Sequence, residues 1–473
     1  MKRLFRILCI VLFVTFIGVP ISAHADIAPP GHPPGSNLGP GVESTQVRMV
    51  AETVVLDVQA STPQGSLGQA RVSADFTMRN LGSAAESMGV RFPLASNNGF
   101  GEIPEIKNVS IKVDGIPVVA RRIMQEDPLW SSDPVPWAEF DVTFPLNQDV
   151  NIHVTYLLEG TGEYPYVAFS YIFHTGAGWK DSIGSADMIV RLPYEANAQN
   201  VIFDEQIGWS QTTPGGTLQG QEIRWHFDNL EPDQNNDFEV SLVMPSAWQK
   251  VLKERINVSG SPKDGEAWGR LGKLYKEMFF FRKGFRHDAG GRELYVMSIE
   301  AYEKSVTLLP NDALWHAGFA DLLAFHADFA AMEGEDSRAE MLRAMQEIHA
   351  ALEISPDNTK VQEIAENVYF SFPADSVQRL ESGYDFLWLT ATPVLSTPTP
   401  APVEPTLTPS ATIPPLSTAI AVTVGEATSA SAATAVPAGE ATSTSTPVTA
   451  TNPLCGSAFL IPLGLVWLAR RKR

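Results

Sequence analysis

The densest group of oxygen donors in the sequence lies in residues 228–237, where carboxylate and amide side chains follow one another. Asp228, Asp233 and Asp237 supply three of the acids, and calcium in proteins is bound mainly by such oxygens. The segment lacks the spacing and central glycine of an EF-hand loop, and aspartate and asparagine are also the ordinary residues of tight turns. A calcium loop and a plain turn both fit, so we predict no resident metal and keep the three aspartates as the calcium candidate.

Two tryptophans, Trp130 and Trp137, lie in a segment that contains three prolines and joins two predicted strands, residues 126–137. Aromatic rings on a loop can stack on a sugar or on a partner protein, and they can equally cover the open end of a β-sandwich. The two tryptophans are therefore candidates for binding an extracytoplasmic protein or a surface glycan, with a packing role as the alternative.

A third candidate is aromatic and basic, which is unusual in an acidic chain. Residues 278–287 include Phe280, Phe281, Arg282 and Arg286. Such a segment can dock on the neighbouring domain, or it can contact an acidic or lipid partner. We keep both interpretations and count these four residues as binding candidates.

No pattern for catalysis accompanies these candidates. Of the nine histidines, His153, His174 and His226 fall on different predicted strands. His316 and His326 share one predicted helix but lie ten residues apart, too far to act as neighbouring ligands on one helical face. The sequence lacks the HExxH, GxSxG, P-loop and dinucleotide fingerprints. The only cysteines, Cys9 and Cys455, lie near the termini. We therefore predict no catalytic residue, no cofactor and no enzymatic activity.

The elements that must position these side chains begin with a β region, residues 45–247. Apolar and polar residues alternate there with period two, and the opening strand contains Val47, Met49, Ala51, Val54 and Leu56. The pair Asp114-Gly115 between two such runs predicts a hairpin. We expect an all-β antiparallel sandwich, as one large or two smaller units, preceded by a flexible leader over residues 26–44.

The opening of this region resembles uncharacterised bacterial exported β-domains. The resemblance is carried by four short segments, residues 47–52, 78–80, 90–94 and 113–115. It implies a fold and an extracytoplasmic location, and no activity.

A helical period replaces the alternation in residues 248–388, where we expect an all-α domain. Four residues fall on one face of its first repeat helix: Trp268, Leu271, Gly272 and Tyr275. Pro310 and Pro356 close two helical units 46 residues apart, and Ala344 is a small residue at the second helix crossing. This pattern resembles tetratricopeptide repeats. The resemblance implies helical pairs whose groove binds peptides or proteins, and a helical buttress without a ligand is the alternative.

The N-terminus, residues 1–25, has the form of a secretory signal peptide. Three basic residues precede an apolar run, and Ala23 and Ala25 supply the small side chains that precede a cleavage site. An uncleaved membrane anchor is the alternative. Either interpretation places the bulk of the chain outside the cytoplasm.

The C-terminus predicts a stalk and an anchor. Residues 389–453 are rich in Pro, Thr, Ser and Ala and lack the apolar bulk for a core, so we expect a disordered linker. Residues 454–473 form an apolar stretch followed by basic residues that include Arg470 and Arg471, which favours a single transmembrane segment with a cytoplasmic C-terminus. The tail also resembles bacterial sorting tails, with Cys455 in the motif position. Plain anchoring and processing of the tail both remain open.

Charge limits the partners. The chain has 54 acidic and 34 basic residues, a net charge of -20, which repels polyanions and excludes nucleic acid as a partner. We predict an exported, membrane- or surface-anchored protein that acts as a protein or glycan interaction module. An envelope-assembly scaffold and a hydrolase of unfamiliar type are the alternatives.

Overall fold

The structure is a computed structural model that describes residues 35–36, 38–41, 44–96, 105–127, 134–203, 212–233, 236–283 and 288–390. The chain divides into two compact units, residues 1–394 and 395–473, and all described residues belong to the first. The predicted signal peptide, most of the predicted linker and the predicted anchor lie outside the described residues. So do eight of the residues named above: Ala23, Ala25, Trp130, Arg286, the two cysteines Cys9 and Cys455, and the two arginines Arg470 and Arg471.

The largest sheet has eight strands, which are antiparallel except for one pair. Buried and more exposed side chains alternate along its longest strands. In β4, every second side chain from Ala70 to Asn80 is buried, and the side chains between them face outward. The strands are, in spatial order, β14 (Thr217–Gln219), β15 (Glu222–Leu230), β12 (Ile183–Arg191), β3 (Val47–Val58), β4 (Gln69–Asn80), β10 (Asp149–Glu159), β6 (Lys107–Val113) and β7 (Ile116–Val118).

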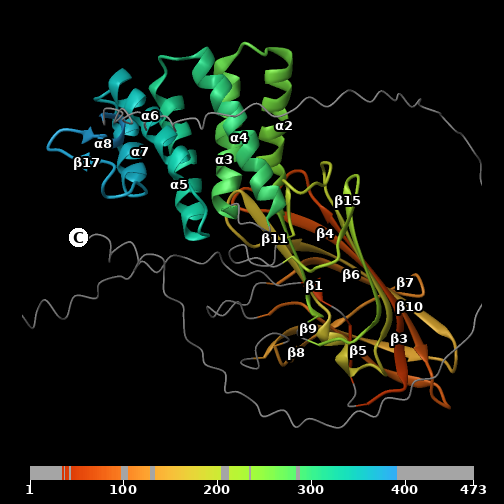
Figure 1. Cartoon of the computed structure of the whole chain (residues 1–473). Coiled ribbons are helices and arrows are strands. Elements are labelled where there is room, and N and C mark those ends of the chain that lie inside the picture. The colour runs from red at the N-terminus through yellow and green to blue at the C-terminus, as the bar shows by residue number, and fades with distance from the viewer. Residues whose placement is uncertain are drawn as a thin grey trace, which may run out of the picture. The chain divides into compact units, whose positions relative to one another are not determined.

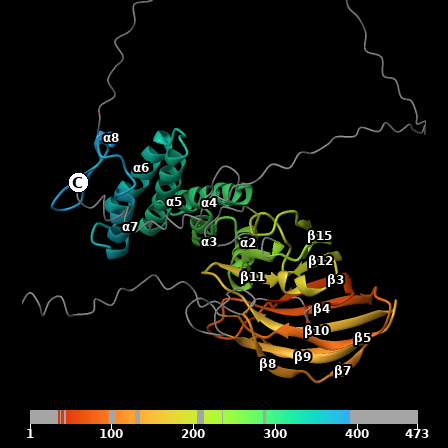
Figure 2. The same ribbon diagram turned by 90° about the horizontal axis from the view of Figure 1, so that it is seen from below.

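Two four-stranded sheets pack against the large one (Figure 2). The ring centroids of Phe92 and Tyr156 lie 5.5 Å apart across one of these interfaces. The first sheet has the order β1 (Gly35–Ser36), β11 (Tyr166–Ile172), β16 (Phe238–Val243) and β13 (Val201–Ile202). The second has the order β2 (Gly39–Pro40), β5 (Glu86–Pro93), β9 (Val135–Phe144) and β8 (Arg121–Gln125).

The expected fold class, an antiparallel all-β sandwich followed by an all-α domain, is wrong. Two of the sheets are mixed, because β12 pairs in parallel with β3 and β1 pairs in parallel with β11. Alternation shows which face of a strand is buried, but it does not show which strand lies beside it or in which direction. The described residues hold sixteen strands before the helices, and the helical region contains a further hairpin, β17 (Gln378–Arg379) with β18 (Tyr384–Asp385).

The leader is also more structured than expected. Residues 35–36 and 39–40 form strands in two different sheets, so the β region begins before residue 45. Leu38 between them is fully buried, and its carbonyl accepts a hydrogen bond of 2.8 Å from the Trp179 indole. The described residues of the leader are thus part of the folded β region.

One register shift changes what the opening strand buries. The pairing of β3 with β4 slips between Met49 and Ala51, which is a β-bulge. Before it the odd-numbered residues point inward, and after it Glu52, Val54 and Leu56 are buried. Ala51 is therefore only half-buried, and a glutamate enters the core.

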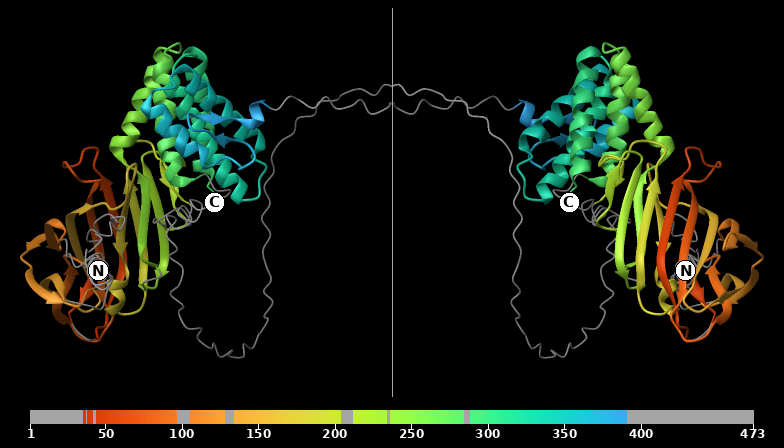
Figure 3. Two further views of the ribbon diagram at one scale, coloured as in Figure 1. Left: turned by 90° about the vertical axis from the view of Figure 1, so that its left-hand side faces the viewer. Right: turned by 90° about the vertical axis from the view of Figure 1, so that its right-hand side faces the viewer.

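Seven α-helices follow in the described residues, and four of them start at an Asp or Asn whose side chain accepts from first-turn N–H groups (Figure 1). They form antiparallel pairs, as Figure 3 shows. The helices are α2 (Pro245–Gly260), α3 (Gly265–Arg282), α4 (Ala289–Leu308), α5 (Ala313–Met332), α6 (Arg338–Ile354), α7 (Thr359–Tyr369) and α8 (Leu387–Thr390).

Small residues let α3 and α4 approach closely. A Cβ on Gly272 would lie 3.0 Å from the Tyr302 ring, and the Ser298 hydroxyl donates to the Gly272 carbonyl at 2.8 Å. Leu271, Tyr275 and Ala344 are buried, Trp268 is half-buried, and Pro310 and Pro356 lie in the links between helices. Helix packing explains this spacing, and membership of the tetratricopeptide repeats stays a prediction.

Within the described part of the chain, we find no helix with the length and apolar character needed to cross a membrane.

Candidate functional site

A cavity of about 310 Å³ lies beside the second four-stranded sheet. Its walls come from the leader, from β5 and β9, from the segment after β8, and from the short 3-10 helix η1 (His174–Gly178). Six of its lining residues carry polar or aromatic groups that a ligand could contact: Arg91, Gln125, Asp127, Trp137, His174 and Thr175.

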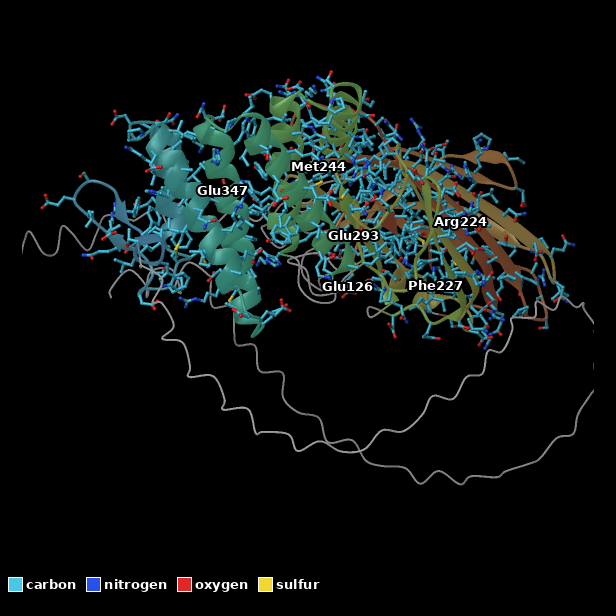
Figure 4. The ribbon with its side chains drawn as sticks, turned by 45° about the horizontal axis from the view of Figure 1, so that its top comes forward. Glu126, Arg224, Phe227, Met244, Glu293 and Glu347 are labelled. Carbon is cyan, nitrogen blue, oxygen red and sulfur yellow. The ribbon has the colours of Figure 1, made fainter. Side chains whose placement is uncertain are left out.

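Trp137 forms the aromatic wall. Its backbone pairs with Pro93 on β5 and with Ile123 on β8, so the residue is held in the middle of a sheet. Its indole N–H donates to the Glu126 carbonyl at 3.1 Å, and Figure 4 labels Glu126 at this edge of the sandwich. The indole is half-buried and its orientation is fixed, which suits a stacking surface.

Arg91 supplies the guanidinium of the cavity. It donates to the Glu139 carboxylate at 2.8 Å and to the Gln125 side-chain oxygen at 3.4 Å. Hydrogen bonds from Arg91 and Arg121 hold the pKa of Glu139 below its usual range, so this carboxylate is charged near neutral pH. Glu139 therefore positions Arg91 at the cavity wall.

The lining residue His174 is paired with an aspartate. His174 Nδ1 lies 2.6 Å from Asp237, and the His174 backbone N–H donates to the same carboxylate at 3.1 Å. Asp237 is one of the three calcium candidates, and in the structure its carboxylate is hydrogen-bonded to His174. Asp228 lies 3.3 Å from His226 Nε2 on the large sheet. Among the residues described, no three His, Cys, Asp or Glu side chains form a group that could hold a metal.

The aromatic and basic segment lies at the junction between sandwich and helices. The rings of Phe281 and Tyr166 stack with centroids 4.6 Å apart, and Phe280 stacks on Phe325 at 4.1 Å. Arg282 is 2% exposed, and its guanidinium donates to the Ala198 carbonyl at 2.6 Å. The segment thus connects the β region to the helices.

Arg282 also forms an ion pair with Asp288, which is 1% exposed. A Cβ on Gly290, two residues after Asp288, would lie 1.9 Å from the Ala198 carbonyl oxygen. The contact between α4 and the sandwich is therefore too close for a side chain. Arg282 and Asp288 are enclosed between the β region and the helices, where a lipid or acidic partner cannot reach them.

One buried carboxyl escaped the sequence-based prediction. Glu52 is 1% exposed and accepts a hydrogen bond of 2.6 Å from the Tyr171 hydroxyl, which comes from the facing sheet. Burial raises the pKa of Glu52 to about 8, against a smaller opposing effect of the Tyr171 hydrogen bond. The sequence carries one signal of it: apolar residues of this strand recur at odd positions up to Ala51 and at even positions from Val54. Their change of position marks the bulge.

Of the residues that line the cavity, sequence reasoning found Trp137 alone. The others come from positions between 39 and 178, on elements that only the tertiary fold brings together. The arrangement combines a fixed indole, a held guanidinium and side-chain amide and carboxyl groups. Such a set can stack on the C–H face of a sugar ring and hydrogen-bond its hydroxyls.

Neither a protein-family model nor a curated protein matches this sequence. Among solved structures, a protein of Legionella pneumophila described as a candidate nutrient binding protein matches 60% of this chain and 100% of its own, at 16% identity and a TM-score of 0.41. A variant of an M1 zinc metallopeptidase of Deinococcus radiodurans matches over 42% of each chain, at 9% identity and a TM-score of 0.22. This chain thus spans less than half the length of that enzyme. Both TM-scores lie below 0.5, so we transfer neither fold nor activity from these proteins.

Proposed function

We propose that this chain is an exported, membrane- or surface-anchored interaction module whose sandwich binds a glycan in the cavity beside Trp137. The observation that carries the proposal is the meeting of an oriented indole with Arg91, Gln125 and Asp127 in one cavity of about 310 Å³. That volume suits one or two sugar rings rather than a protein surface. The anchor and the stalk, proposed from the sequence, would present this cavity outside the cell.

Binding is tested on a glycan array with the purified full-length chain in a neutral detergent, followed by calorimetry on the strongest ligand. Trp137→Ala is expected to weaken binding at least tenfold, about 1.4 kcal/mol. Trp388→Ala is the matched control, because Trp388 lies on α8 against Arg338 and away from the cavity. Equal affinity of the Trp137→Ala variant and the wild type for every array ligand would contradict the proposal.

The His174–Asp237 pair favours one second candidate, a hydrolase that acts on the same ligand. An imidazole oriented by a carboxylate is the usual general base of hydrolytic sites. We expect no turnover, so the bound glycan should be recovered intact after long incubation with excess protein. Cleavage that is lost in His174→Gln, with binding retained, would establish the hydrolase instead.

A further inference from the structure

A second cavity, of about 530 Å³, lies in the helical region. It is formed by the end of α6, the turn into α7, and the β17–β18 hairpin, all within residues 349–386. None of its lining residues belongs to the sandwich, so it is distinct from the cavity beside Trp137.

The walls of this cavity are fixed by contacts within the fold. Glu366 on α7 accepts hydrogen bonds from Arg379 at 2.7 Å and from the Tyr384 hydroxyl at 2.9 Å, which tie both strands of the hairpin to the helix. Phe386 is 5% exposed and packs edge-on against His349, with centroids 5.4 Å apart. The hairpin therefore holds a permanent hollow against the helices.

The chemistry of the lining is apolar at the base and acidic at the rim. Leu352 and Phe386 supply apolar surface, and Glu353, Asp357 and Glu381 are exposed carboxylates. With Glu366 there are four carboxylates against one arginine, a formal charge of -3 with histidine counted as neutral. Arg379 is already engaged by Glu366, and Glu353 lies 3.3 Å from His349 Nε2, so Arg379 is the one permanently charged cation among the lining residues.

We propose that this cavity binds a lysine- or arginine-bearing segment of a partner polypeptide. A long basic side chain matches the lining, because its aliphatic stem packs on apolar surface while its charged head stays among carboxylates and water. The aromatic rings of Tyr384 and Phe386 add a favourable surface for a cation. A volume of about 530 Å³ exceeds one side chain, so a short stretch of the partner enters. The inference is independent of the glycan site.

The test uses the full-length chain and a fluorescent peptide in which lysines alternate with leucines. Fluorescence anisotropy should show binding that weakens with salt, and acetylation of the lysines should abolish it. The triple variant Glu353→Gln, Asp357→Asn, Glu381→Gln should bind at least tenfold more weakly. A matched triple, Glu195→Gln, Glu300→Gln, Glu303→Gln, removes three exposed carboxylates elsewhere and should change affinity less than threefold.

Several results would overturn the proposal. They are equal binding of the acetylated peptide, equal binding by the rim triple, or an equal loss in the matched triple, which would indicate general charge attraction. Binding of spermine without binding of the peptide would identify a small organic cation instead. Trp137→Ala should bind the peptide like the wild type, so failure here and failure of the glycan proposal can be told apart.

Discussion

The interior of the sandwich and its junction with the helices each contain a carboxyl that is 1% exposed, Glu52 and Asp288. At the junction Asp288 faces the guanidinium of Arg282, which also donates to the Ala198 carbonyl at 2.6 Å. In the sandwich, Glu52 accepts a hydrogen bond from the neutral hydroxyl of Tyr171, and burial raises the pKa of Glu52 to about 8. The fold thus accommodates one buried carboxyl as an ion and the other as an acid that is neutral below about pH 8.

The difference shows how each region resists the cost of burying charge. An ion pair keeps its members charged but makes each dependent on the other, because removal of one leaves an isolated charge in a low-dielectric site. A buried acid beside a neutral hydroxyl avoids the charge by holding its proton, and the stability that it contributes then depends on pH. The junction should be sensitive to mutation, and the sandwich interior should be sensitive to pH.

The largest expected effect is on the junction. Arg282→Met should lower the free energy of unfolding by about 3–5 kcal/mol, because Asp288 would be left buried without its cation. Urea denaturation followed by tryptophan fluorescence measures this. The double variant Arg282→Met, Asp288→Leu removes both charges and should be more stable than the single variant. If the free energy of unfolding of Arg282→Met lies within 1 kcal/mol of the wild-type value, the buried ion pair does not make the junction sensitive to mutation.

The sandwich interior should respond to pH instead. The folded pKa of Glu52, about 8, exceeds the ordinary value of 4.5, so folding requires a proton throughout the interval between them. Its contribution to stability is complete below pH 4.5 and is lost as the pH rises to about 8, at roughly 1.4 kcal/mol per pH unit. Between pH 6 and 7.5, wild type should lose about 2 kcal/mol relative to Glu52→Gln.

The measurement is a set of urea titrations of both proteins at several pH values. Taking the difference between them cancels the other titrating groups. Glu300→Gln, an exposed glutamate on α4, is the control and should follow wild type at every pH. Parallel curves for wild type and Glu52→Gln would show that Glu52 is charged in the folded protein.

The smallest effect is expected on the surface. Arg79 and Asp149 form an ion pair of 2.5 Å on the large sheet, with side chains 42% and 39% exposed. Water and salt screen such pairs, so the free energy of unfolding of Asp149→Asn should equal the wild-type value within experimental error. A loss as large as that of Arg282→Met would show that burial is not what separates the two kinds of pair.

Local features of the fold could be predicted well from the sequence. The Asp114-Gly115 hairpin is confirmed, with both residues at positive φ, 47° and 78°, and Val113 paired with Ile116. The positions of Gly272 and Tyr275 on one helical face follow from period alone and agree with the close α3–α4 crossing. These features depend on neighbours within a few residues, which sequence reasoning can see.

The sequence by itself determined which residues of strands such as β4 alternate between two faces and which residues of α3 share one face, because period and turn chemistry are local. Trp137, which was expected on a loop, lies in strand β9. Only the tertiary structure decided that β3 and β12 run in parallel, that a bulge turns Glu52 inward, and that Arg282 is enclosed at a junction. It also brought Arg91 and His174 to Trp137 from separate elements. The physical reason is that strand order, register and cavity lining depend on contacts between residues far apart in the chain, which leave no spacing pattern in the sequence.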